Sequence, residues 1–219
     1  MPEQMVRSIK RFHHDAEILQ LTNQSTPAVA GVTSVVRAAF DESEPMFARS
    51  ALYASVVESG EPVCFLDADM LLVRPFPGGE FLNPQVVYLC ERYFNRSSLV
   101  NTRFAGLNLC EHEGKTLHEA WPYLGCFIVT ASVFGLLQIH EIYKNLPSKL
   151  RRWYGDQEAL RIFAARNPTR VSYVSEREFG WLPTGEFDSL SHIPGDVKIM
   201  HFKGARKQHM PRFFSELMR

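Results

Sequence analysis

Two aspartates in the first third of the chain are the residues best placed to do chemistry. Asp67 and Asp69 stand between two apolar runs, residues 63–66 and 70–73. If the chain is extended there, both side chains point to one face, and two carboxylates that close repel each other unless a cation lies between them. Mg²⁺ or Mn²⁺ suits such a pair and commonly bridges it to a substrate phosphate. The pattern predicts a metal site, and a solvated strand end that carries two acids by chance is the alternative.

The apolar residues before the pair predict the element that positions it. A short apolar run of this kind is typical of a buried strand in an α/β sheet. Open α/β sheets bind ligands beyond the carboxyl ends of their strands. We therefore expect Asp67 and Asp69 to lie at the ligand-binding edge of a sheet.

A basic C-terminal segment, residues 203–219, is the second candidate. It follows a strand expected at residues 198–202, and it carries five Lys or Arg residues against a single Glu. A basic segment that contains a glycine, here Gly204, and leaves a strand end can clamp an anion, with Lys207 as a candidate contact. A solvated tail is the commoner fate of such a run, so both interpretations stay open.

Two further candidates stand inside regular elements. Arg49 lies in the first turns of a helix expected at residues 46–58, where an exposed arginine is the usual case. Gly125 interrupts a strand expected at residues 121–130. A glycine inside a strand indicates either a bulge or the close approach of a ligand or another chain segment, and the residues do not decide between the two.

The last candidates open a helix expected to begin at residues 155–157. Asp156 is well placed as an ordinary N-cap, and on the sequence alone this structural role is favoured for it. Gln157 follows directly in the first turn.

The alternation of strands and helices predicts an α/β fold. We expect a single domain over residues 1–219, with a mostly parallel sheet and helices on both faces. The helix at 46–58 is expected to bury Phe47, Ala51, Ala54 and Val57. Further helices are expected at residues 1–13 and 132–145, further strands at 17–22, 85–90 and 171–174, and long loops at 91–119 and 181–196.

Composition narrows the classes of function. The chain has 219 residues, of which 45% are hydrophobic and 22% are charged, as in an ordinary globular protein with a real core. Its 24 basic and 24 acidic residues give no reason to expect nucleic acid or an anionic membrane as a partner. No signal peptide or membrane-spanning run is visible, and the four cysteines have no zinc spacing, so we expect a cytoplasmic protein with reduced thiols.

The order of these features resembles the GT-A type nucleotide-sugar glycosyltransferases, most nearly glycosyltransferase family 8, the glycogenin and galactosyltransferase group. Residues 65–69 look like the family's Asp-x-Asp, and residues 201–207 match its His-x-x-Gly-x-x-Lys. Residues 155–158 resemble its Asp-Gln stretch, and Arg49 matches a basic residue that contacts the donor. Only Gly125 is shared with the family's Asn-Ala-Gly strand. The resemblance spans roughly residues 5 to 207.

The resemblance implies a reaction and a role for each matched residue. The protein would move a sugar from a nucleoside diphosphate donor, a UDP-sugar, to the hydroxyl of a carbohydrate or other acceptor, with retention at the anomeric carbon. Mn²⁺ or Mg²⁺ would be the cofactor. Its ligands would be Asp67, Asp69 and His201; the donor would contact Arg49, Asp67, Gly125, Gly204 and Lys207; and Asp156 and Gln157 would be the catalytic residues at the sugar.

Two departures from the family pattern accompany the resemblance. Family members begin with a strand and a loop that bind the nucleobase before a crossover helix, whereas Met1 already stands in what looks like that helix. We therefore expect the sheet to lack its usual first strand. In addition, Gln208 follows Lys207 where the family has proline and then tryptophan.

Two alternative functions stay open. A haloacid-dehalogenase-like phosphatase would also present an Asp-x-Asp after an apolar strand, with Asp67 as the nucleophile. Such an enzyme places that strand near the domain start, and it would leave residues 201–207 unexplained. The other alternative is a degenerate protein of the same fold that binds a nucleotide sugar without turning it over, which the short N-terminus favours.

Overall fold

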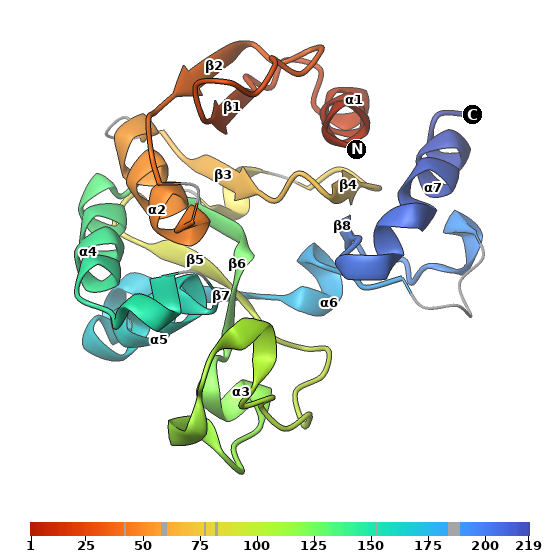
Figure 1. Ribbon diagram of the computed structural model, residues 1–219. Helices are drawn as coiled ribbons and strands as arrows, with labels where there is room; N and C mark the ends of the chain where they lie inside the picture. The colour runs from red at the N-terminus through yellow and green to blue at the C-terminus, as the bar shows by residue number, and fades with distance from the viewer. Residues whose placement is uncertain (42, 58–60, 77, 82, 152, 184–188) are drawn as a thin grey trace. The chain divides into compact units, whose positions relative to one another are not determined.

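The computed structural model describes residues 1–41, 43–57, 61–76, 78–81, 83–151, 153–183 and 189–219. Over these residues the chain is an α/β protein, which confirms the predicted fold class (Figure 1). It divides into two compact units. Unit 1 comprises Met1–Ala39, Leu66–Gly78 and Ser175–Arg219, and unit 2 comprises Phe40–Phe65 and Gly79–Val174.

Unit 1 contains two short strand pairs. β1 (Leu19–Thr22) pairs in parallel with β2 (Ser34–Arg37), and β4 (Met70–Leu72) pairs antiparallel with β8 (Ile199–His201). β1 and β8 lie where the sequence predicted strands, whereas β2 is an addition that the sequence analysis missed.

The first element of unit 1 is the helix α1 (Pro2–Phe12). Proline in its first turn and basic residues in its last turn both favour a helix over these residues. The buried Ser8 joins α1 to β4, because its Oγ accepts a hydrogen bond from the backbone N–H of Leu72 at 3.1 Å. Residues 1–15, all of which the structure describes, contain no strand.

The basic C-terminal segment is folded. It forms the short helix η7 (Gly204–His209) and then α7 (Met210–Leu217). Four apolar side chains of α7 are buried, namely Met210, Phe213, Phe214 and Leu217. A solvated tail is therefore the wrong interpretation for the residues of α7.

A four-stranded sheet runs in the order β3–β6–β5–β7. Its strands are β3 (Val63–Leu66), β5 (Val87–Glu91), β6 (Tyr123–Thr130) and β7 (Val171–Ser175). β5 and β6 are antiparallel, so both directions of pairing occur in the protein. Every residue of β6 after Tyr123 is buried, which accounts for the unbroken apolar run in the sequence.

Three helices of unit 2 pack beside one another (Figure 1). They are α2 (Pro45–Val56), α4 (Val133–Lys144) and α5 (Gly155–Arg166), and α5 also packs against β6. α4 begins as predicted, because Ser132 Oγ accepts a hydrogen bond from the N–H of Gly135 at 3.1 Å.

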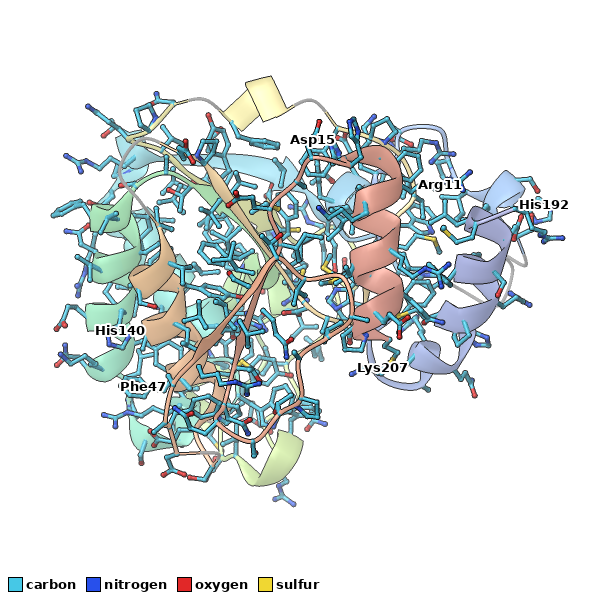
Figure 2. All side chains as sticks on the ribbon, turned by 90° about the horizontal axis from the view of Figure 1, so that it is seen from above. Arg11, Asp15, Phe47, His140, His192 and Lys207 are labelled. Carbon is cyan, nitrogen blue, oxygen red and sulfur yellow. The ribbon has the colours of Figure 1, made fainter. Side chains whose placement is uncertain are left out.

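The buried face of α2 differs from the prediction. Ala48, Leu52 and Tyr53 are buried within the helix, whereas Phe47, Ala51 and Ala54 are half-buried; Val57, just after the helix, is buried as predicted. Phe47 instead lies beside His140 of α4, with ring centroids 5.2 Å apart (Figure 2). The predicted helix end, at Glu58, lies outside the described residues.

The apolar residues on the two sides of the aspartates form two strands rather than one. β3 ends at Leu66 and β4 begins at Met70. The residues between them turn, with the N–H of Met70 donating to the carbonyl of Asp67 at 3.2 Å.

The long segment between β5 and β6 is an excursion without strands of its own, as expected. It contains η2 (Phe104–Gly106), η3 (Cys110–His112) and α3 (Leu117–Ala120). The remaining short helices are η1 (Gly78–Phe81), η4 (Ser148–Arg151), η5 (Pro168–Arg170), α6 (Glu176–Phe179) and η6 (Leu190–His192). Within the described parts of the chain, no helix combines the length and the apolar character that crossing a membrane requires.

Candidate functional site

Three predicted metal ligands converge in unit 1. The antiparallel pairing of β4 with β8 places His201 opposite Met70, the residue after Asp69. His201 Nε2 lies 3.2 Å from Asp69 Oδ1 and 3.7 Å from Asp67 Oδ2. One ligand atom from each of the three residues lies within 4.8 Å of the others. Residues that are 132 or more positions apart in sequence thus meet because two strands pair in one register.

This group of three residues has the chemistry and the spacing of a divalent-cation site. Two carboxylates and an imidazole are suitable ligands for Mn²⁺, and carboxylates suit Mg²⁺. In octahedral coordination at about 2.1 Å from the metal, neighbouring ligand atoms lie about 3 Å apart. The distances from His201 Nε2 to Asp69 and Asp67 are close to that separation, so the residues fit such an ion.

Lys207 adds a cation to the same group. Its Nζ lies 3.1 Å from Asp69 Oδ2, and its side chain is 46% exposed. Burial alone would raise the pKa of Asp69, but the hydrogen bonds and positive charge of His201 and Lys207 outweigh it and lower the pKa to about 2. Asp69 is therefore an anion at neutral pH, as a metal ligand must be.

The turn after β8 brings Lys207 back to Asp69. Gly204 has φ +57°, a left-handed conformation that glycine adopts without steric cost. The turn is held on both sides of this glycine, since Lys203 Nζ lies 3.0 Å from Glu176 Oε1 and Arg206 Nε donates to the carbonyl of Pro183 at 2.9 Å. Gly204 thus allows the backbone turn that places Lys207 beside Asp69.

Three other predicted residues converge in unit 2. Arg49 Nη2 donates to the carbonyl of Gly125 at 2.6 Å and to Asp156 Oδ2 at 2.9 Å. A β-carbon at position 125 would collide with both the Asp156 carboxylate and the Arg49 guanidinium. The glycine is therefore required by the close approach of two side chains.

Gly125 also lies in an irregular part of the strand. Leu89 of β5 pairs with Ile128, whereas the next residue, Cys90, pairs with Leu124. Three residues of β6, Gly125 among them, thus lie between the partners of two consecutive residues of β5, which is a bulge in β6. Both interpretations of this glycine, a bulge and a close approach, are correct.

Asp156 is not the N-cap of α5, and this prediction was wrong. The N-cap is Tyr154, with φ +61°, and Asp156 is the second residue of the helix. Its Oδ1 accepts the backbone N–H of Gln157 at 2.8 Å, while Oδ2 accepts from Arg49. The carboxylate thus has both oxygens engaged, in a first turn where the helix dipole favours negative charge.

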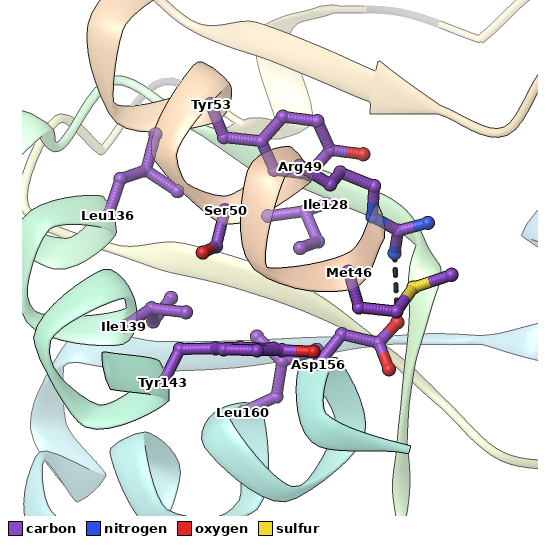
Figure 3. Close-up of a pocket in the computed structure, with 10 residues that line it drawn as sticks. All are labelled: Met46, Arg49, Ser50, Tyr53, Ile128, Leu136, Ile139, Tyr143, Asp156 and Leu160. Atoms are coloured by element: carbon purple, nitrogen blue, oxygen red, sulfur yellow. Dashed lines mark hydrogen bonds and ion pairs between the residues drawn. The ribbon is translucent and has the colours of Figure 1, made fainter. Parts of the chain in front are cut away.

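A small pocket lies beside the Arg49–Asp156 pair (Figure 3). Its walls are mostly apolar side chains from α2, α4 and α5, and they include Met46, Leu136, Ile139 and Leu160. Surroundings of low polarity strengthen an ion pair relative to one in water. The pocket therefore helps to fix Arg49 against Asp156.

The sequence analysis missed one residue of this group, Arg92. It is 7% exposed and follows β5 directly. Its Nε donates to the carbonyl of Trp121 at 3.0 Å, and its Nη2 donates to Gln157 Oε1 at 2.6 Å. The only signal in the sequence is an arginine placed directly after an apolar strand, in a segment that otherwise reads as a polar loop.

The predicted site residues therefore form two groups, each inside one unit. Asp67, Asp69, His201, Gly204 and Lys207 belong to the group in unit 1, and Arg49, Gly125, Asp156 and Gln157 belong to the group in unit 2.

Comparison with known proteins identifies the fold. No protein-family model matches the sequence, and no curated protein matches it significantly. Among solved structures, a glycosyltransferase involved in the glycosylation of the major capsid of PBCV-1 is similar, with 12% identity over 90% of this chain and 100% of that chain and a TM-score of 0.56. The galactosyltransferase LgtC, in complex with donor and acceptor sugar analogues, is similar over 99% of this chain and 90% of its own, with 14% identity and a TM-score of 0.53.

An active-site mutant of LgtC, a glutamine-to-glutamate change, is similar over the same shares, with 12% identity and a TM-score of 0.52. At these identities the likeness shows the fold. The chain has the GT-A fold of these glycosyltransferases, which confirms the fold that the resemblance implied.

Proposed function

We propose that this protein is a glycosyltransferase that moves a sugar from a UDP-sugar to an acceptor hydroxyl with the help of a divalent cation. The observation that carries this proposal is the group formed by Asp67, Asp69 and His201, with ligand atoms within 4.8 Å of one another, in a chain that has the GT-A fold.

The group in unit 1 is assigned to the diphosphate. Asp67, Asp69 and His201 would hold Mn²⁺ or Mg²⁺, and the bound ion supplies charge neutralisation at the leaving diphosphate. The exposed ammonium of Lys207 is a mobile point charge suited to a phosphate oxygen. Gly204 lets the backbone turn so that this ammonium reaches the group.

The group in unit 2 is assigned to the donor sugar. Asp156 anchors Arg49, and Arg49 in turn holds the backbone at Gly125, so the three form one rigid cluster. Gln157 follows Asp156 in the first turn of α5 and offers an amide to a sugar oxygen. The LgtC structure in which a glutamine-to-glutamate change is an active-site mutation supports an active-site role for a glutamine here.

Retention at the anomeric carbon is part of the proposal. An inverting enzyme needs a carboxylate base beside the acceptor hydroxyl. The carboxylates in the matched motifs are Asp67 and Asp69, assigned to the metal, and Asp156, whose two oxygens are already engaged. NMR of the product should therefore show the donor's anomeric configuration, and an inverted centre would contradict this part.

UDP release tests the function itself. The purified protein is incubated with a panel of UDP-sugars and Mn²⁺, with EDTA in a parallel reaction and para-nitrophenyl phosphate as a control substrate. We expect UDP release from at least one UDP-sugar with Mn²⁺ and none with EDTA. Release of inorganic phosphate from the control substrate alone would indicate a phosphatase, and UDP binding without turnover would indicate a nucleotide-sugar-binding protein.

We also place the protein in the cytoplasm. Four cysteines without metal spacing, three of them in strands β3, β5 and β6, favour a reducing compartment.

A further inference from the structure

We infer that Arg92 is a positioning residue that fixes the amide of Gln157 with its nitrogen toward the substrate, so that Gln157 acts as a hydrogen-bond donor to an oxygen of the transferred sugar. This inference rests on the proposed function and adds a residue and a direction to it.

The first step of the argument is the identity of the atoms in contact. An amide offers an acceptor oxygen and a donor nitrogen, whereas a guanidinium has donors only. The atom of Gln157 that lies 2.6 Å from Arg92 Nη2 must therefore be Oε1. The two hydrogens on Nε2 are then directed away from the guanidinium, so the amide presents its donor group to other partners on that side.

The second step is that Arg92 is itself held in place. Its side chain is buried at 7% exposure, and its Nε donates to the carbonyl of Trp121 at 3.0 Å. Its backbone N–H donates to the carbonyl of Pro122 at 2.7 Å. A guanidinium fixed at the backbone and at Nε cannot turn freely, so it restricts the amide that it contacts.

The third step compares two arginine contacts made by consecutive residues at the start of α5. Arg49 engages the side chain of Asp156, and Arg92 engages the side chain of Gln157, the next residue. In each pair a guanidinium takes one oxygen of the side chain. Asp156 has its second oxygen on a backbone N–H, whereas Gln157 has a donor group in the corresponding place.

Substitutions can separate two requirements, the orientation of the Gln157 amide by Arg92 and the hydrogen-bond donor that this amide supplies. Gln157→Glu keeps an oxygen for Arg92 but removes the donor. Arg92→Met keeps the amide and a side chain of similar length but removes the guanidinium that orients the amide. Arg92→Lys restores one donor, and Arg166→Met removes an exposed arginine from the far end of the same helix as a matched control.

We expect Arg92→Met and Gln157→Glu each to lower kcat for the best UDP-sugar at least tenfold, with KM and UDP affinity close to wild type. The double variant should lose little more than either single variant, because both changes remove the same oriented donor. Arg92→Lys should recover part of kcat, and Arg166→Met should behave as wild type. Wild-type kcat in Arg92→Met alongside a large loss in Gln157→Glu would overturn the inference and leave the proposed function standing.

A spectroscopic measurement keeps the inference separate from turnover. The side-chain amide signals of Gln157 are assigned in a ¹⁵N–¹H spectrum by their loss in Gln157→Glu. We expect them to shift in Arg92→Met and to stay in place in Arg166→Met. If the wild type turns over no UDP-sugar, the proposed function fails; an unshifted amide in Arg92→Met then overturns the positioning role as well, and a shifted one supports it.

Discussion

At the scale of single residues, Asp69 has two cationic neighbours that affect both its charge and the stability of the fold. Asp69 Oδ1 lies 3.2 Å from His201 Nε2, its Oδ2 lies 3.1 Å from Lys207 Nζ, and Asp67 Oδ2 lies 3.7 Å from the same His201 Nε2. A pKa of about 2 for Asp69, against the usual 3.8, means that its ionised form also stabilises the fold. Substitution of Asp69 should therefore affect stability as well as metal binding.

Asp67→Asn and Asp69→Asn should each abolish Mn²⁺-dependent binding of UDP, because each removes a hard anionic ligand at nearly constant size. Calorimetric titration of UDP with and without Mn²⁺ measures the effect. Asp69→Asn should also lower the free energy of unfolding, by at most about 2.5 kcal/mol, the equivalent of its pKa shift. Normal Mn²⁺-dependent binding in both variants would show that the metal assignment is wrong.

His201 and Lys207 should fail in different ways. His201→Ala should weaken the contribution of Mn²⁺ to UDP binding, because a ligand is lost. Lys207→Ala should weaken UDP binding by about 1.5–3 kcal/mol while the dependence on Mn²⁺ is kept, because one charged hydrogen bond is lost. Titration of UDP into both variants at saturating Mn²⁺ measures the two affinities. Wild-type affinity in both variants would show that neither His201 nor Lys207 takes part in UDP binding.

At the scale of elements, the close approach at Gly125 explains why β6 carries a glycine inside an apolar run. Gly125→Ala should displace the Arg49–Asp156 pair and lower the free energy of unfolding by about 1–3 kcal/mol, the usual cost of overpacking. Gly195→Ala is the matched control, because a β-carbon there meets nothing within 4 Å. Denaturant titration of both variants measures the difference, and equal stability would mean that the neighbours of Gly125 yield without cost.

Helix α7 gives a second test at this scale. Phe213 is 1% exposed, and its ring centroid lies 5.8 Å from that of Phe202. Phe213→Ala should lower the free energy of unfolding by about 3–5 kcal/mol, as large-to-small changes in a core do. Ser215→Ala, at an exposed position of the same helix, should change it by less than about 0.5 kcal/mol. If both substitutions changed the free energy of unfolding by similarly small amounts, the C-terminal segment would be a solvated tail rather than part of the core.

The elements also show how far the sequence predicts the fold. Strands β3, β5, β6, β7 and β8 and helices α1, α2, α4 and α5 follow from apolar runs and helix starts, because those signals are local. The buried face of α2 does not, because this helix contacts both α4 and α5 and so has no single apolar stripe. The N-cap prediction for Asp156 was wrong, because the helix is capped at Tyr154, and the partner of Asp156, Arg49, lies 107 residues away in the sequence.

At the scale of the whole molecule, each predicted group depends on pairings that no local pattern encodes. His201 joins the aspartates through the register of β4 with β8, and the motifs on the two strands predicted this only through the resemblance to a known family. Arg92 was missed because an arginine is rarely buried, and only the assembled fold shows that Trp121 and Gln157 supply its partners. The motifs thus predicted which side chains come together better than they predicted the contacts that support them.

Stability of the whole molecule should depend on pH through two histidines, the buried His112 and the half-buried His140. Burial, followed by the charge of Lys144, lowers the pKa of His140 below its usual 6.5. The same direction holds for His112, where burial comes first and Lys115 second. A histidine with a lowered pKa binds its proton more weakly in the folded than in the unfolded state. The unfolded state therefore gains protons first as the pH falls below 6.5, and stability falls with it.

A single substitution at His140 tests this dependence. Ser50 Oγ donates to the carbonyl of Phe47 at 2.8 Å, so His140 Nδ1, at 2.9 Å from that Oγ, must be the donor in their contact. Asparagine places an amide N–H near the position of Nδ1 and does not titrate. His140→Asn should therefore match the wild type in free energy of unfolding to within about 1 kcal/mol at pH 8 and lose less stability between pH 7 and pH 5. Urea unfolding at several pH values measures both slopes, and an unchanged slope in the variant would show that His140 does not contribute.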